Sequence, residues 1–394
     1  MSRSLQETLR LLGSRNLLTA QVANRVFGLV GSKDYRAQSE RSELIDGISD
    51  VASLIQIRDS FRQDDAKPRF PDRIDSNNRM YGIKRSLFGA RHRELTVPAI
   101  EHGLFLGDFV IPADTIETGA PAVATFGSYR KRVIQARQDV PVFEVGPYIH
   151  YAQPHVGFEQ LLAMKEKLGR TLLVYISHST WDAQIERAAD PFSWIEEYAA
   201  EFESVIVSVF WWDLEREFVR DLLAKGYHVT SCGLMHDRNF LARQKTVLML
   251  ADFAIGDGVG THSGYCLHEG VPYRFVDVNT RVILNQAAGR ESQEFGTRAS
   301  MDVVEAVKDI FRDADQPPEQ MRRDPVLNEL WGFDSVRTGA ELESILNISR
   351  RVARRSWGNR RNFLRALETI VDEGAGDEGK LLVHGLRANG EAER

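Results

Sequence analysis

The chain has 394 residues, of which 43% are hydrophobic and 27% are charged, and this composition predicts an ordinary globular protein large enough for two domains. The formal net charge of −6 gives no overall attraction for nucleic acid, so we expect no nucleic-acid partner. With only two cysteines, Cys232 and Cys266, a disulfide scaffold is excluded, and no Cys or His spacing indicates zinc.

The cysteine count and the lack of long apolar runs predict the cellular compartment. Few cysteines are typical of a reducing cytoplasm, and residues 1–21 lack the long apolar run of a signal peptide. No stretch reaches the roughly 20 apolar residues that cross a bilayer. We therefore predict a cytoplasmic protein, with peripheral contact at the inner face of the membrane left open.

The first 79 residues predict helices followed by a connection. Apolar side chains at helical spacing predict helices over 4–30 and 42–63. Two interpretations stay open for their basic face, which are contact with anionic lipid and simple solvation. Residues 64–79 are polar, contain two prolines and predict an exposed connection.

Residues 80–150 predict an α/β unit with one helix, Tyr129–Gln138. Its apolar segments of strand length are Thr96–Ile100, Asp108–Pro112, Ala122–Phe126 and Val142–Val145. Together with the leading helices they define a predicted first domain over residues 1–155.

A His-Gly pair follows the first of these strands, which places His102 at the carboxyl end of the strand and towards a second domain. An imidazole there can act as a general base towards an acceptor hydroxyl, because its ordinary pKa lies near neutral pH. Glu101 is the second candidate for the base and Asp114 the third, while a core or capping histidine is the structural alternative.

Gly127 and Ser128 start a helix after the strand Ala122–Phe126. Arg130 and Lys131 in this helix are expected either to approach a phosphate or an acidic acceptor, or to face solvent.

Strands alternate with helices over a predicted second domain, residues 156–335, and this alternation indicates a parallel doubly wound sheet. The predicted strands are Leu172–Ile176, Ser204–Phe210, His228–Ser231, Phe253–Ile255 and Tyr273–Val276. The predicted helices are Trp194–Phe202, Asp213–Lys225, Phe240–Leu250 and Ser263–Glu269. Ligands of such sheets bind outside the carboxyl ends of the strands.

Two polar or aromatic segments follow these strands directly. Ser177, His178 and Ser179 could bind a phosphate of the donor, with a helix cap as the alternative. Trp211 and Trp212 could stack on a base or a sugar, although aromatic residues beside a strand are more often part of the core.

The most informative stretch is the glycine-rich turn between Phe253–Ile255 and Ser263–Glu269. Gly258 and Gly260 give the backbone freedom there, and Thr261, His262 and Ser263 stand where a helix should begin. Free backbone N–H groups at a helix start suit a phosphate. The spacing matches neither a P-loop nor the dinucleotide fingerprint, and a purely steric turn is the alternative.

This stretch, ADFAIGDGVGTHSGYCLHEGVPYRFVD at 251–277, resembles the nucleotide-sugar half of GT-B glycosyltransferases, above all bacterial enzymes that build capsule or lipopolysaccharide. The resemblance is specific over 251–277 and extends in pattern over roughly 96–335. It implies two Rossmann-like doubly wound domains with helical N- and C-terminal extensions. It also implies that residues 177–179 and 260–263 hold the donor diphosphate, that Glu269 bonds ribose or sugar hydroxyls, and that Cys232 and Gly233 contact the nucleobase through their backbone.

The predicted function is transfer of a sugar from a nucleotide-sugar donor to a saccharide or lipid-linked saccharide acceptor in bacterial surface polysaccharide synthesis. No cofactor and no metal are expected, because no convincing Asp-x-Asp loop is present. Three alternatives stay open: a sugar-nucleotide 2-epimerase, a pyruvyl or polyol-phosphate transferase on the same fold, and a non-catalytic sugar-binding protein.

The chain after residue 300 predicts helices. Those expected are Met301–Arg312, Glu341–Arg355 and Asn359–Val371. The last two belong to a predicted C-terminal segment, residues 336–394, whose Gly- and Glu-rich tail from 373 is expected to be mobile.

Overall fold

The computed structural model describes residues 80–89, 97–108, 110, 120–137, 140–178, 183–186, 192–233, 237–278, 281–284, 298–312 and 316–355. The helices predicted before residue 64, the connection 64–79, the helix Asn359–Val371 and the tail lie outside these residues. Asp114 and Ser179 also lie outside them, as does the side chain of Trp212.

The larger sheet is parallel throughout and has the strand order β7-β6-β4-β8-β9. Its strands are β4 (Thr171–Tyr175), β6 (Ser204–Ser208), β7 (His228–Thr230), β8 (Phe253–Gly256) and β9 (Tyr273–Phe275). The chain builds outward from β4 to β7 and then returns to add β8 and β9 on the other side of β4. This doubly wound order confirms the predicted parallel sheet and puts its switch point between β4 and β8.

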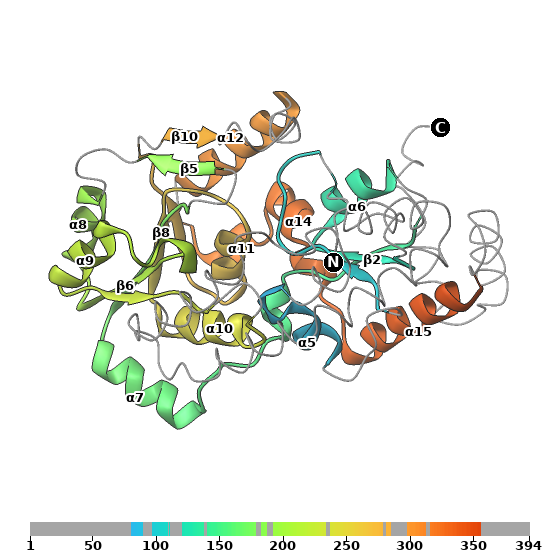
Figure 1. Ribbon diagram of the computed structural model, residues 1–394, viewed down its shortest axis with the longest axis horizontal. Helices are drawn as coiled ribbons and strands as arrows, with labels where there is room; N and C mark the ends of the chain where they lie inside the picture. The colour runs from blue at the N-terminus through green and yellow to red at the C-terminus, as the bar shows by residue number, and fades with distance from the viewer. Residues whose placement is uncertain are drawn as a thin grey trace, which may run out of the picture.

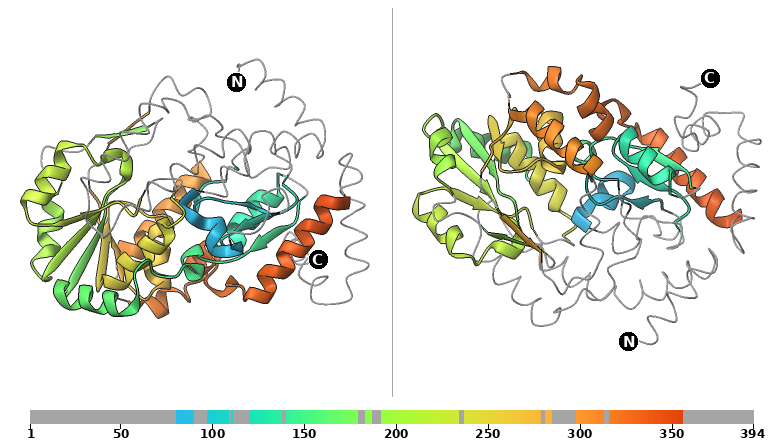
Figure 2. Two further views of the ribbon diagram at one scale, coloured as in Figure 1. Left: turned by 60° about the horizontal axis from the view of Figure 1, so that its bottom comes forward. Right: turned by 90° about the horizontal axis from the view of Figure 1, so that it is seen from above.

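The sequence of β4 explains its central position. All five residues are buried, and their side chains alternate between two cores: Leu173 and Tyr175 belong to the main core, and Leu172 and Val174 to the second. A strand buried on both faces is typical of a parallel sheet covered by helices on each side. Figure 2 shows these helices.

Each face of this sheet has its own helices. The second core receives side chains from α8 (Ser193–Ala199) and α9 (Glu217–Ala224), and the main core receives them from α10 (Phe240–Leu250) and α11 (Thr261–His268). The predicted bounds of α10 agree with the structure at both ends. The remaining elements here are α7 (Phe158–Leu168), η6 (Trp211–Asp213) and α12 (Arg298–Arg312).

The smaller sheet has three parallel strands in the order β1-β2-β3. Its strands are β1 (Ala99–Ile100), β2 (Val123–Thr125) and β3 (Val142–Glu144), and α6 (Ser128–Gln135) connects the last two. The strand predicted over Asp108–Pro112 is wrong where it can be judged, because Asp108 and Val110 are not in a strand. The described strands of this sheet run in sequential order, so the doubly wound order predicted for this part of the chain is not shown by them.

The two sheets lie at opposite ends of the described part, with α5, α11 and α14 between them (Figure 1). The connecting elements are η1 (Met80–Gly82), α5 (Ile83–Phe88), η5 (Tyr148–Tyr151), α13 (Pro318–Met321), α14 (Pro325–Trp331), η8 (Phe333–Ser335) and α15 (Gly339–Arg355). The C-terminal helices return to the smaller sheet, since α14 packs on α6 and α15 on α5. The domain limits at 155 and 335 stay predictions.

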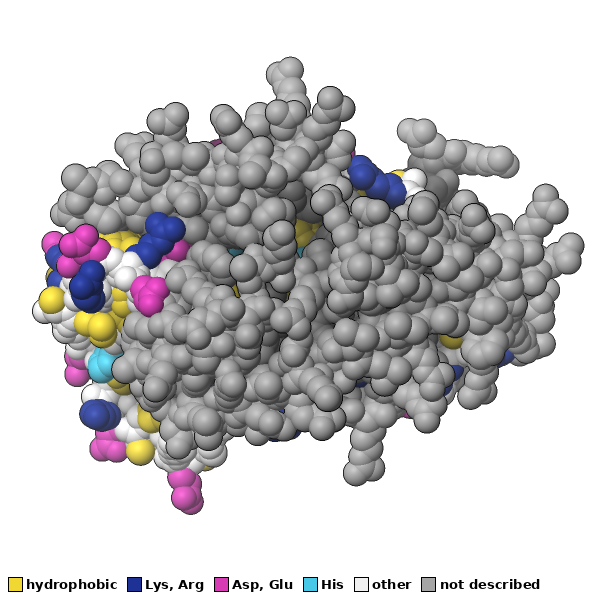
Figure 3. Space-filling model, in the orientation of Figure 1, with side chains coloured by type: hydrophobic (Ala, Val, Ile, Leu, Met, Phe, Trp, Pro, Cys, Tyr) yellow, Lys and Arg dark blue, Asp and Glu magenta, His cyan; other side chains and the backbone are white. Residues whose placement is uncertain are grey.

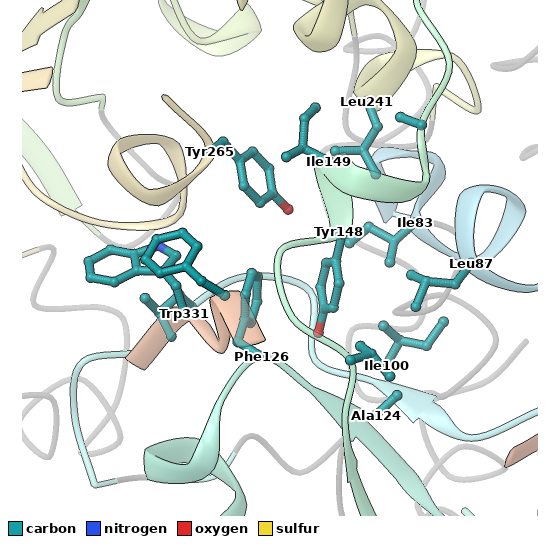
Figure 4. Close-up of a cluster of buried hydrophobic side chains, with 14 of the residues drawn as sticks. Ile83, Leu87, Ile100, Ala124, Phe126, Tyr148, Ile149, Leu241, Tyr265 and Trp331 are labelled. Carbon is teal, nitrogen blue, oxygen red and sulfur yellow. The ribbon is translucent and has the colours of Figure 1, made fainter. Parts of the chain in front are cut away.

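One continuous core joins the two sheets (Figure 4). Tyr148 of η5 packs on Phe126 after β2, with 4.2 Å between the ring centroids, and Phe126 in turn faces Tyr265 of α11 at 6.4 Å. Trp331 of α14 is fully buried in the same cluster, against Gly264 of α11. A Cβ at Gly264 would overlap the Trp331 ring, so a glycine is required for this contact.

Two strands far apart in the sequence form a separate antiparallel pair that was not predicted. These are β5 (Ala183–Glu186) and β10 (Arg281–Leu284). Described side chains of both charges are intermixed on the larger-sheet end of the face shown in Figure 3. Among the described helices, none is both long enough and apolar enough to cross a membrane.

Candidate donor and acceptor site

The loops after β4 and β8 meet at the switch point. Because Tyr175 pairs with Gly256 in parallel register, both strands end at the same edge of the sheet. The backbone nitrogen of Ser177 donates a hydrogen bond of 2.5 Å to Oδ1 of Asp257, and a Cβ at Gly258 would lie 3.1 Å from Oγ of Ser177. The structure therefore confirms that the predicted phosphate loops, at 177 and at 258–261, share one edge.

The start of α11 closes on itself through Ser263. The Ser263 hydroxyl accepts a hydrogen bond from Gly260 N at 3.2 Å and donates one to Gly260 O at 2.8 Å, and the residue is fully buried. The prediction that this side chain binds a ligand phosphate is therefore corrected: it shapes the turn. The groups left for an anion are the first backbone N–H groups of the helix, at Thr261 and His262, which have no intrahelical acceptor.

The His262 side chain is directed into the protein. Its Nε2 atom lies 3.1 Å from the Tyr273 hydroxyl and 3.3 Å from Gly258 O, and its ring packs on Tyr175 at 4.6 Å. Burial lowers the pKa of this imidazole to about 4, partly offset by the hydrogen bond to Gly258. The expected phosphate contact of this side chain is corrected as well, because a neutral imidazole supports the glycine-rich turn from within.

Of two further predicted donor residues, Glu269 lies apart from the start of α11, whereas His178 is near enough for its charge to lower the pKa of His262 in addition to burial. Glu269 follows the other end of this eight-residue helix, about 12 Å away, and pairs with Lys245 at 3.1 Å. His178 is exposed and stacks on Phe210, two residues beyond the end of β6, with ring centroids 4.0 Å apart. This contact of Phe210, which the sequence placed at the end of a predicted strand, was not predicted.

The loop after β7 has an unusual backbone conformation and packs against a buried ion pair. Cys232 has a left-handed conformation with φ +47, and burial raises the pKa of its thiol to about 12, so the thiol stays protonated. Gly233 at φ +116 packs against Asp237 and Arg243, which form a buried ion pair. This loop lies two strands from β4, about 10 Å along the sheet edge. Its backbone contact with a nucleobase stays a prediction.

The loop after β1 brings His102 to the start of α11. The backbone nitrogen of Leu104 donates a hydrogen bond of 2.8 Å to Oγ1 of Thr261, and a Cβ at Gly103 would lie 3.3 Å from that oxygen. His102 stands two residues before this bond. Sequence reasoning missed Leu104, because a backbone N–H leaves no signal in a sequence.

The environment of His102 sets its protonation state. Its Nδ1 atom is buried with no hydrogen-bond partner among the described residues, and its ring stands edge-on to Phe105 at 5.2 Å. Burial lowers the pKa of the imidazole to about 4. The side chain is therefore neutral at pH 7, and as long as it stays buried it is a weaker base than an ordinary imidazole.

Glu101 has a structural position instead of the predicted role as an alternative base. Its carboxylate is fully buried and accepts hydrogen bonds from Arg130 Nη2 at 2.6 Å and from the Thr125 hydroxyl at 2.6 Å. Arg130 is fully buried too, which corrects its expected exposure to solvent or phosphate. Lys131 lies inside the protein, 3.9 Å from Glu144, and burial lowers its pKa.

Comparison with known proteins places the chain in no family. No protein-family model and no curated protein matches it. Solved structures that match include a UDP-glucosyltransferase from Polygonum tinctorium, at 12% identity over 85% of this chain and 69% of that chain, with a TM-score of 0.26. A UDP-glucose:anthocyanidin 3-O-glucosyltransferase matches at 11% identity over 79% and 69%, with a TM-score of 0.27.

The wall teichoic acid polymerase TagF matches at 9% identity over 85% of this chain and 98% of that chain, with a TM-score of 0.29. TM-scores below 0.5 do not establish a common fold between this chain and these proteins. Within the described part of the chain, no group of three or more His, Cys, Asp or Glu side chains is placed to hold a metal ion.

Proposed function

We propose that this protein is a glycosyltransferase that moves a sugar from a nucleotide-sugar donor to an acceptor hydroxyl. The observation that carries the proposal is the hydrogen bond from Leu104 to Thr261. It joins a loop bearing a neutral histidine to a helix start suited to phosphate, at the switch point of a parallel sheet. Such switch points are where nucleotide ligands bind in doubly wound folds.

The donor half of the site would use the backbone more than side chains. A diphosphate at the start of α11 would accept hydrogen bonds from the N–H groups of Thr261 and His262. The Thr261 hydroxyl accepts from Leu104, so its own hydrogen can be donated to a ligand. These donors would stabilise the negative charge that grows on the leaving diphosphate, which supports transfer without a metal.

The acceptor half would use His102. As the acceptor oxygen bonds to the anomeric carbon of the donor sugar, the bond from that carbon to the diphosphate oxygen breaks. The acceptor proton passes to the imidazole, which is neutral at pH 7 and has a ring nitrogen without a partner among the described residues to receive it. The diphosphate leaves as an anion held at the start of α11.

The epimerase alternative is not favoured by the carboxylates near this junction, since Glu101 is held by Arg130 and Asp257 by the backbone of Ser177. No observation favours transfer of pyruvyl or polyol-phosphate groups. We further propose that the acceptor is a saccharide or lipid-linked saccharide of a bacterial surface polysaccharide, on the strength of the resemblance over 251–277.

The test begins with thermal shifts for nucleoside mono- and diphosphates, because a ligand that binds the native state raises the melting temperature. The nucleotide that raises it most is then supplied as its nucleotide sugars, with and without saccharide acceptors. Release of nucleoside diphosphate that requires an acceptor supports the proposal. Conversion of the nucleotide sugar to an isomer without acceptor would show an epimerase, and no shift with any nucleotide would refute the donor site.

A further inference from the structure

We propose that Arg130 is a positioning residue that holds the loop 101–107, which carries His102, against the start of α11. The inference rests on the proposed function for the chemistry of His102, and on the contacts of the loop for everything else. Arg130 lies in the first turn of α6, directly behind this loop. It contacts the loop at both ends and in the middle.

The guanidinium of Arg130 spans the loop. Its Nε atom donates to Glu101 Oε1 at 3.0 Å, and its Nη2 atom donates to the same oxygen at 2.6 Å. Its Nη1 atom donates to Gly107 O at 2.5 Å. One rigid planar group therefore holds the first and the last residue of the segment that carries His102 and Leu104.

A second route runs through a ring. The guanidinium carbon of Arg130 lies 5.5 Å from the centroid of the Phe105 ring. The same ring receives the His102 imidazole in an edge-on arrangement at 5.2 Å, with an interplanar angle of 80°. The position of the imidazole thus depends on Arg130 through side-chain packing as well as through the backbone.

Stability alone does not account for this ion pair. Both partners have no exposed side-chain surface, and such buried pairs are often replaced by apolar residues with no loss of stability. What an apolar pair or a lysine lacks is a fixed fork of donors that reaches two separate acceptors. The guanidinium group can donate to the Glu101 carboxylate and to the Gly107 carbonyl at the same time, and so it links the two residues.

The experiment compares two charge-free double variants on the full chain. Arg130→Met/Glu101→Gln removes the hydrogen bonds from Arg130 to Glu101 and to Gly107, and it keeps an acceptor for the Thr125 hydroxyl. Lys131→Met/Glu144→Gln removes the neighbouring buried pair, which also joins α6 to the smaller sheet, and is the matched control. Turnover, nucleotide affinity, melting temperature and the NMR titration of ring-labelled His102 are measured on both, with His102→Gln used for assignment.

For Arg130→Met/Glu101→Gln we expect turnover to fall by roughly 10²-fold, the loss typical of a misplaced catalytic group, while nucleotide affinity stays within about two-fold. The His102 ring should titrate nearer its ordinary pKa of 6.5 instead of about 4, because the loop no longer holds it buried. The control variant should retain the turnover and the His102 titration of the unmodified protein. Arg130→Lys should show the same fall in turnover and the same shift in the His102 titration, because lysine keeps the charge but lacks the planar guanidinium with its several donors.

Unchanged turnover and unchanged His102 titration in a folded Arg130→Met/Glu101→Gln variant would overturn the inference, and so would equal losses in the control. If the double variant does not fold, Arg130→Lys decides by the same two readouts. The titration of His102 needs no substrate. A shifted titration in a protein with no transferase activity would therefore support the positioning role while refuting the proposed function.

Discussion

Leu104 and Thr261 are 157 positions apart in the chain, yet the backbone nitrogen of the first donates a 2.8 Å hydrogen bond to the side-chain oxygen of the second. This bond joins the loop of the smaller sheet to the first helical residue after the glycine-rich turn of the larger sheet. The Thr261 hydroxyl has a hydrogen left to donate. One side chain can thus contact the donor phosphate and the loop of His102 at the same time.

Replacing Thr261 tests this dual role. Thr261→Val keeps the shape and removes the hydroxyl, so Leu104 loses its acceptor and a ligand loses a donor. We expect nucleotide affinity to weaken by about 1–3 kcal/mol, the usual cost of an unmade hydrogen bond. Calorimetric titration of the best-binding nucleotide measures it. Thr261→Ser keeps the hydroxyl and is the control; equal affinity in both variants would remove Thr261 from the site.

Two aspartates flanking β8 offer a matched pair of variants. Asp257 accepts from the backbone of Ser177 beyond the end of β4, and Asp252 accepts at 2.7 Å from the backbone of Thr171 at its start. Asp257→Ala removes the tie to Ser177. Asp252→Ala removes the tie to Thr171 together with a 2.5 Å ion pair to Lys165. Both substitutions should therefore lower the free energy of unfolding by about 1–3 kcal/mol.

Only one of these ties lies at the edge where a nucleotide is proposed to bind. Asp257→Ala should therefore weaken nucleotide binding, and Asp252→Ala should leave it unchanged. Denaturant unfolding and nucleotide titration on both variants provide the comparison. Weaker binding in Asp252→Ala, with Asp257→Ala unaffected, would put the ligand at the opposite edge of the sheet.

The packing of α14 on α11 predicts a stability effect. A Cβ at Gly264 would overlap the buried ring of Trp331, so Gly264→Ala must displace that ring. We expect a loss of about 1–3 kcal/mol, as for other overpacked cores, measured by denaturant unfolding. A Cβ at Gly339 would meet no atom within 4 Å. Gly339→Ala should therefore cost nothing, and an equal loss in both variants would contradict the packing described here.

Buried histidines make stability depend on pH. Burial lowers the pKa of His102, His262 and His268 to about 4 from an ordinary value of 6.5. Between these values the unfolded chain binds more protons than the folded one, so this stability is fully present above pH 6.5 and is lost as the pH falls towards 4. The melting temperature should fall more steeply over that window in the unmodified protein than in His268→Gln. Parallel curves would show that His268 keeps its ordinary pKa when folded.

The sequence predicted the larger sheet well because its signals are local. The apolar run of β4, the helix Phe240–Leu250 and the glycine-rich turn each lie within about a dozen residues. Pairings between distant segments were not predictable in this way. The β5–β10 pair joins strands nearly a hundred residues apart, and no composition signal marks it.

The sequence predicted that the loops after β4 and β8 share one edge of the sheet, but it did not predict the contacts that their side chains make. A hydroxyl at a helix start can bind a ligand or close its own turn, and only the geometry shows that Ser263 closes the turn. The direction of the His262 ring depends on Tyr273, which comes from the next strand. Glu101, next to His102, was a candidate base because of its position in the sequence. Its hydrogen-bond partner Arg130 lies 29 positions away, so the sequence did not show that this carboxylate is held in a buried ion pair.

In the proposed enzyme, the donor groups belong to the larger sheet and the acceptor groups to the smaller sheet, with His102 as the base. The most direct measurement is a paired one on His102→Gln, which keeps a polar side chain that cannot take a proton: turnover with acceptor, and nucleotide affinity by titration. We expect turnover to fall by roughly 10²–10⁴ while nucleotide affinity is unchanged, because the donor groups belong to α11 and the loop after β4. Turnover that survives, or nucleotide affinity that falls together with it, would contradict this division.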